Sequence, residues 1–179
     1  VIMKSITVFT SNQPRHLRLI IELSKVYENV CAVIECNTVK PGINKDFFNN
    51  SAPMKTYFSK VTNSEREIFG EITFLPKNVS TLVLKMGDLS NINIDVLSPS
   101  LKSEDFVVFG SSFIKGILVD ILIEKRCLNI HMGISPFYRG SSCNFWALYN
   151  EDYKYVVSES MLKNMAKKIG LNNAKELNE

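Results

Sequence analysis

The pattern of apolar and polar positions divides the first part of the chain into a strand, a helix and a second strand. Residues 5–10 are β-branched and apolar, which is typical of a buried strand. A turn that contains Pro14 precedes an apolar stripe over residues 16–23, and this combination predicts a helix. Residues 29–36 form another apolar run of strand length. The order strand, helix, strand predicts the unit from which parallel sheets are built.

The alternation of strands and helices continues along the rest of the chain. Five further segments have the pattern of a regular element: a helix within 46–69, a strand at 81–85, a strand at 106–110, a helix at 117–125 and a strand at 127–131. Strands that alternate with helices predict an α/β fold with a doubly wound, mostly parallel sheet. Ligands of such sheets bind beyond the carboxyl ends of the strands. We therefore expect the functional residues within 10–15, 110–116 and 129–140.

Composition and charge narrow the class of protein. Hydrophobic residues make up 45% of the chain and charged residues 22%, as in ordinary globular domains. The net charge of +3 is spread along the sequence, so we expect no nucleic-acid partner. No apolar run has the length of a membrane span, and the start lacks the apolar core of a signal peptide. We expect a cytoplasmic protein that does not contact a membrane.

The cysteines show neither the spacing of a zinc site nor that of a disulfide framework. They are Cys31, Cys36, Cys127 and Cys143, and no two form a C-x-x-C pair. The two histidines, His16 and His131, lie far apart in sequence. We therefore expect reduced thiols and no metal site.

Asn129 and His131 supply two groups that suit acyl transfer. In a strand over residues 127–131, alternation places both side chains on the same side. An amine that attacks a formyl carbon creates an oxyanion and sheds a proton, so it needs a hydrogen-bond donor and a group that titrates near neutrality. Taken alone, however, the pair favours a structural role, in which His131 caps the strand end and Asn129 bonds loop backbone.

The segment around this pair adds a specific pattern. Residues 129–140 read N-I-H-M-G-I-S-P-F-Y-R-G, which resembles the signature N-[IV]-H-x-S-L-L-P-x-[YW]-R-G of formyltransferases that use 10-formyltetrahydrofolate. Six positions match: Asn129, His131, Pro136, Tyr138, Arg139 and Gly140. Gly133 stands where the family has a serine, and Ser135 replaces the second leucine. The resemblance implies a Rossmann-like formyltransferase fold and an enzyme in which Asn129 donates to the oxyanion and His131 assists proton transfer.

Two loops are the candidate binding sites. Residues 107–116 resemble the strand and loop that hold the pterin ring in this family, partly by backbone hydrogen bonds. The candidates for binding the formyl donor are Phe113, Ile114, Lys115 and Gly116; an ordinary strand-to-helix loop is the alternative. The candidates for binding the acceptor are Asn12, Arg15, Ser135 and Arg139. Asn12 and Arg15 flank a helix start, which can bind an anion or can simply be a capped end, and Arg139 also suits a purely structural turn.

The resemblance implies transfer of a formyl group from 10-formyltetrahydrofolate to a primary amine of a small acceptor. Residues 11–16 replace the glycine-rich phosphate loop of the glycinamide ribonucleotide enzymes, so we favour an amino sugar linked to a nucleotide. The alternatives are phosphoribosylglycinamide formyltransferase, a non-catalytic folate- or nucleotide-binding module, and a hydrolase of the donor. The expected partner is the small-molecule amine, and a homodimer stays open.

One part of the family pattern is absent. Family members carry a catalytic aspartate in a D-x-G stretch after the histidine, and this chain has no such stretch. Asp152 comes too early to be assigned that role. The resemblance runs to Val156 and then changes abruptly, so we hypothesise a missing segment between Val156 and Val157. We accordingly expect a formyltransferase catalytic domain over residues 1–156 and a C-terminal amphipathic helix over 157–179, which follows that domain or packs on it.

Overall fold

The structure is a computed structural model that describes residues 4–36, 51–140, 143–158, 160–161 and 164. It divides into two compact units, Val1–Cys127 and Leu128–Glu179, which are described in turn.

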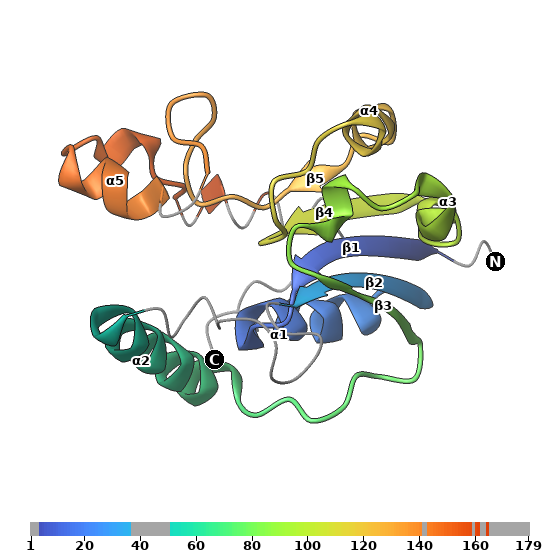
Figure 1. The fold of residues 1–179 in the computed structure, drawn as a ribbon, viewed down its shortest axis with the longest axis horizontal. Coiled ribbons are helices and arrows are strands. Elements are labelled where there is room, and N and C mark those ends of the chain that lie inside the picture. The colour runs from blue at the N-terminus through green and yellow to red at the C-terminus, as the bar shows by residue number, and fades with distance from the viewer. Residues whose placement is uncertain (1–3, 37–50, 141–142, 159, 162–163, 165–179) are drawn as a thin grey trace. The chain divides into compact units, whose positions relative to one another are not determined.

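A parallel sheet forms the centre of the first unit (Figure 1). Its strands are β1 (Ser5–Ser11), β2 (Asn29–Cys36), β3 (Val79–Lys85) and β4 (Asp105–Phe109). β1 pairs in parallel with both β2 and β4, and β2 pairs in parallel with β3. The order of the whole sheet is β3-β2-β1-β4-β5, where β5 (Leu128–Asn129) opens the second unit. The chain thus runs from β1 to one side and then returns to the other, which places a topological switch point at the carboxyl ends of β1 and β4.

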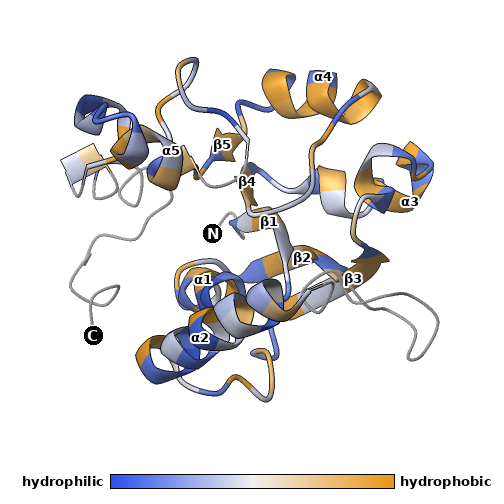
Figure 2. Cartoon of the chain, turned by 60° about the vertical axis from the view of Figure 1, so that its left-hand side comes forward, coloured by the Kyte–Doolittle hydropathy of each residue, from blue (hydrophilic) through white to orange (hydrophobic). Residues whose placement is uncertain are grey.

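Helices cover both faces of this sheet (Figures 1 and 2). α1 (Pro14–Ser24) and α2 (Ala52–Phe69) lie on one face, while α3 (Ile94–Leu97) and α4 (Ile117–Glu124) lie on the other. Two short 3-10 helices, η2 (Asp88–Ser90) and η3 (Ser100–Lys102), flank α3. The predicted α/β, doubly wound fold class is confirmed.

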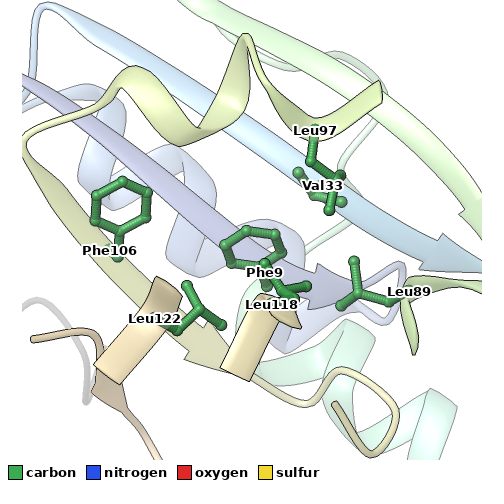
Figure 3. Packing of buried hydrophobic residues seen from close by; sticks show 7 residues of the cluster. All are labelled: Phe9, Val33, Leu89, Leu97, Phe106, Leu118 and Leu122. Atoms are coloured by element: carbon green, nitrogen blue, oxygen red, sulfur yellow. The ribbon is translucent and has the colours of Figure 1, made fainter. Parts of the chain in front are cut away.

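Strand alternation divides the apolar residues between the two faces. Phe9 of β1, Val33 of β2 and Phe106 of β4 point to the face that α3 and α4 cover (Figure 3). The residues that pack against them are Leu89, Leu97, Leu118 and Leu122. Leu118 and Leu122 are four positions apart, so they project from the same side of α4. Figure 2 shows that α4 is apolar on most of its surface.

Most of the predicted elements are present, and several differ in extent. The helix expected within residues 46–69 runs from Ala52 to Phe69, and residues 46–50 lie outside the described part. The strand expected at 127–131 was wrong in length, because β5 contains only Leu128 and Asn129. Nearly all of the predicted helix over 157–179 lies outside the described residues.

The described part of the second unit consists of a loop, a short helix and a segment around Val156 and Val157 that returns to the loop. α5 (Cys143–Tyr149) is followed by η4 (Tyr153–Tyr155). Val156 forms an antiparallel bridge with Gly133, and the Val157 N–H donates to the Met132 carbonyl at 3.0 Å. The returning segment therefore fixes the loop that follows His131 from both sides of the Val156–Val157 junction. The predicted missing segment at this junction, and the predicted domain boundary there, stay predictions.

Candidate functional site

In the first unit, the loop between β4 and α4 surrounds an open depression. Phe113, Ile114, Lys115 and Gly116, the four predicted donor-binding residues, line it together with Ile117, Val119 and Asp120 of α4, and it encloses about 680 Å³. Gly116 has a φ of 74°, which favours glycine, and it is the N-cap residue of α4, with no side chain to cap the helix. The Phe113 side chain is 84% exposed. This loop therefore offers backbone groups and an exposed aromatic ring to a ligand.

A buried carboxylate accepts hydrogen bonds from the loop between β4 and α4 and holds it in place. Glu35, at the end of β2, is fully buried. Its Oε2 accepts the Ser112 N–H at 2.6 Å, and its Oε1 accepts the Ser112 hydroxyl at 2.9 Å. The Ser90 hydroxyl adds a second tie by donating to the Phe113 carbonyl at 2.6 Å. Glu35 is not among the residues predicted for the site, although a lone acidic residue inside the apolar run over residues 29–36 is a signal that could have found it.

The loop between β1 and α1 holds the first two predicted acceptor-binding residues. Asn12 is exposed, and Gln13 caps α1 without a side-chain hydrogen bond. The Arg15 guanidinium forms an ion pair and a hydrogen bond with Glu65 of α2. Arg15 is therefore already neutralised by a carboxylate, so an anion at this helix start would compete with Glu65.

A second residue that sequence reasoning did not assign is His16, which fills the switch point between β1 and β4. Its Nδ1 lies 2.5 Å from the Ser11 hydroxyl, and its ring meets the Phe109 ring edge to face at a centroid distance of 4.7 Å. Gly110 has a φ of 71°, and a Cβ there would collide with the imidazole. Burial, helped by the neighbouring Arg15 charge, lowers the pKa of His16 to about 3. The ring is thus a neutral part of the sheet edge.

In the second unit, His131 is held by the backbone of its own loop. Its Nδ1 lies 3.0 Å from the Gly133 carbonyl oxygen, and its Nε2 lies 3.0 Å from the Gly140 carbonyl oxygen. A neutral imidazole has one N–H, so it can donate to only one of these two oxygens. Asn129 is exposed at the end of β5, and His131 comes after that strand. Strand alternation therefore does not apply to this pair, because His131 is not part of a strand.

Gly133 explains one departure from the family pattern. A Cβ at this position would lie 2.5 Å from Cys143 Cβ and 2.6 Å from the Tyr138 carbonyl oxygen, so a serine would fit here only if these atoms shifted. The close approach brings Cys143 Sγ to 3.7 Å from His131 Nε2 and to 3.0 Å from the Gly140 carbonyl, to which the thiol donates. Burial raises the pKa of the Cys143 thiol, which keeps it protonated as this donor.

Aromatic and polar contacts stabilise the rest of the signature loop. Phe137 stacks on Tyr155 at a centroid distance of 4.0 Å. The Tyr138 hydroxyl donates to Asp152 Oδ2 at 2.6 Å. Asp152 is therefore a partner of Tyr138. The peptide bond between Ser135 and Pro136 is cis, and the side chains of Ser135 and Arg139 are exposed.

The described residues offer no metal site and no membrane span. No group of three or more histidine, cysteine, aspartate or glutamate side chains among them is arranged to hold a metal ion. All four cysteines are free thiols. In the part of the chain that the structure describes, no helix combines the length and the hydrophobicity needed to cross a bilayer.

Among known proteins, the chain is similar to some solved structures. No family model matches the chain, and no curated protein matches it significantly. Phosphoribosylglycinamide formyltransferase from Anaplasma phagocytophilum is similar at a TM-score of 0.46 and 15% identity, over 82% of this chain and 58% of that one. Glycinamide ribonucleotide transformylase 1 from Geobacillus kaustophilus is similar at a TM-score of 0.46 and 18% identity, over 83% of this chain and 68% of that one. The function proposed below therefore rests on the residues of the chain itself.

Proposed function

We propose that the chain is a formyltransferase domain that moves a formyl group from 10-formyltetrahydrofolate to a primary amine. The observation that carries this proposal is the position of His131 inside its own signature loop. Gly133 and Gly140, whose carbonyls contact the two ring nitrogens, both belong to the segment that resembles the family signature. The loop thus serves to hold an imidazole, which is the group that the reaction requires.

In the proposed reaction the acceptor amine attacks the formyl carbon, and the bond from that carbon to N10 of the folate breaks. The amine loses a proton, and the leaving nitrogen gains one. Asn129 donates its amide N–H to the oxyanion of the tetrahedral intermediate. His131 accepts and returns the proton at Nε2 while its Nδ1–H donates to the Gly133 carbonyl. For this step the Gly140 carbonyl, 3.0 Å from Nε2, must give way to the substrate.

The donor is assigned to the depression beside α4, where the four loop residues and α4 supply apolar surface and backbone groups. For the acceptor, an amino sugar linked to a nucleotide remains our proposal, because residues 11–16 lack phosphate-binding glycines. The names of the two similar structures give this acceptor no support, and they make glycinamide ribonucleotide the second acceptor to test. The ion pair between Arg15 and Glu65 leaves little free positive charge for a phosphate at this loop.

One assay tests the activity and the acceptor together. The protein is incubated with 10-formyltetrahydrofolate and, separately, with a panel of amino sugar nucleotides, glycinamide ribonucleotide or water alone, and the release of tetrahydrofolate is measured. Release that depends on one amine supports the transferase and identifies its acceptor, whereas release in water alone would indicate a hydrolase. Binding of the donor without release in any mixture would indicate a non-catalytic folate-binding module and contradict the proposal.

A further inference from the structure

Glu35 connects two loops that are far apart in sequence. Its Oε1 accepts the Gly87 N–H at 2.9 Å and the Leu89 N–H at 3.2 Å, both from the segment after β3. The same oxygen accepts the Ser112 hydroxyl, while Oε2 accepts the Ser112 N–H. One carboxylate thus receives four hydrogen bonds from the loops that follow β3 and β4.

Burying a carboxylate in a core costs free energy, because the charged group loses its contact with water. Glu35 lies on the same face of β2 as Val33, and Leu89, which donates to it, belongs to the apolar core on that face. An apolar side chain at this position would avoid the cost of burying a charge. It would, however, leave the amides of Gly87, Leu89 and Ser112 without the acceptor that they share. The carboxylate therefore contributes hydrogen-bond acceptors for the two loops, and it does not improve the packing of the core.

The position of Ser112 gives this arrangement its functional consequence. Ser112 directly precedes Phe113, the first of the donor-binding candidates, and Ser90 holds the Phe113 carbonyl. These contacts fix where residues 113–116 enter the depression. A loop that binds a ring through backbone groups depends on the placement of its backbone to within a fraction of an ångström.

We propose that Glu35 is a positioning residue for the formyl donor: it holds the loop over residues 111–116 in the conformation that binds the folate. This role rests on the proposed function. Glu35 does not face the ligand, because it is fully buried beneath the loop. Its removal should therefore weaken donor binding and leave the chemical step and the affinity for the acceptor intact.

The substitution Glu35→Gln isolates the role. An amide has one acceptor oxygen, which can keep the three donors near Oε1, but its NH₂ group then faces the Ser112 N–H, donor against donor. We expect the KM for 10-formyltetrahydrofolate to rise at least about tenfold, since a hydrogen bond to a charged group is lost and a partly buried donor is left unpaired. The kcat at saturating donor and the KM for the acceptor should change by less than about twofold. Amide hydrogen exchange of residues 111–113 should become faster.

Tyr27→Phe is the matched control. The Tyr27 hydroxyl donates to Asp105 Oδ2 at 2.8 Å, and Asp105 is the first residue of β4, at the opposite end of the sheet from Ser112. The control removes a hydrogen bond made by a buried residue without touching the loop, so it should lower stability and leave the donor KM unchanged. Ser112→Ala, which removes the hydroxyl and keeps the N–H, is the second variant in case Glu35→Gln does not fold, and should raise the donor KM by about threefold.

The outcomes distinguish failure of the proposed function from failure of the proposed role of Glu35. Direct binding of 5-formyltetrahydrofolate, a stable probe of the donor site, is measured by calorimetry alongside the kinetics. If the wild-type protein binds no folate, the proposed function fails, and this role fails with it. If the wild type binds and Glu35→Gln binds equally well, or shows unchanged amide exchange at residues 111–113, only the role of Glu35 is overturned. Weaker binding with faster exchange, absent in Tyr27→Phe, supports it.

Discussion

The buried imidazole of His16 makes the stability of the protein depend on pH, and this dependence begins above the range in which carboxylates titrate. His16 is 2% exposed and its pKa is lowered to about 3, first by desolvation and second by the charge of Arg15. An unfolded chain binds a proton at His16 below its ordinary pKa of 6.5, whereas the folded protein does not. The unfolded state therefore gains protons as the pH falls, and stability is lost between pH 6.5 and about 3, while it is fully present above pH 6.5.

At mildly acidic pH the loss in stability depends only on the ordinary pKa of 6.5 that His16 has in the unfolded chain. Between pH 7.5 and 5.5 the linkage relation gives a loss of about 1.4 kcal/mol in the free energy of unfolding, for any folded pKa well below 5.5. If the folded pKa is near 3, the loss should approach about 5 kcal/mol at the acid end of the range. Only the first of these figures can be measured without interference from titrating carboxylates.

The assay is urea denaturation at the two pH values, for the wild type and for His16→Asn. Asparagine can keep a polar contact with Ser11 and does not titrate, so the variant should be less stable at pH 7.5 but should lose about 1.4 kcal/mol less than the wild type on going to pH 5.5. Contributions from all other titrating groups are common to both proteins and cancel in this difference. An equal loss in the two proteins would refute a buried, neutral His16.

Three further substitutions test the site and its supports. His131→Ala should lower kcat at least about a hundredfold, the usual scale for removal of an acid–base group, and an unchanged rate in the tetrahydrofolate-release assay would remove His131 from the reaction. Gly133→Ala should lower the free energy of unfolding by about 1–3 kcal/mol, because its Cβ would meet Cys143 Cβ at 2.5 Å, and thermal denaturation measures this loss. Arg15→Ala should cost about 1 kcal/mol in the same measurement by leaving Glu65 without its partner, and adding Glu65→Gln should recover most of that loss.

The sheet and its helices follow from local patterns, because burial imposes a period on each element. The strands over Ser5–Ser11 and Asn29–Cys36 are buried on both faces, as strands between two helical layers must be, and the sequence alone locates them to within a residue or two. The short β5 shows where this reasoning ends. Residues 127–131 have the composition of a strand, but pairing is decided by the neighbouring chain, and only Leu128 and Asn129 are in the ladder.

The candidate site was predictable only where a motif carries it. The pattern over residues 129–140 locates His131, but its contacts with the carbonyls of Gly133 and Gly140 depend on how the loop folds back. Three of the four donors to Glu35 are backbone N–H groups, which almost any residue type supplies, and they lie 52, 54 and 77 residues away in sequence. Local periodicity contains no information about such contacts.

The distance in sequence between Glu35 and Ser112 also bears on how the protein folds. β4 pairs with β1 on the side away from β2, and the paired residues are about a hundred positions apart along the chain, as Thr10 and Phe109 are. During synthesis, β1, α1 and β2 can associate long before β4 leaves the ribosome. The loop over residues 111–116 can acquire its anchor only after this late, long-range pairing has formed. Protection of the Ser112 amide is therefore a marker for the final stage of folding, and a protein that has its sheet but not this bond has not finished folding.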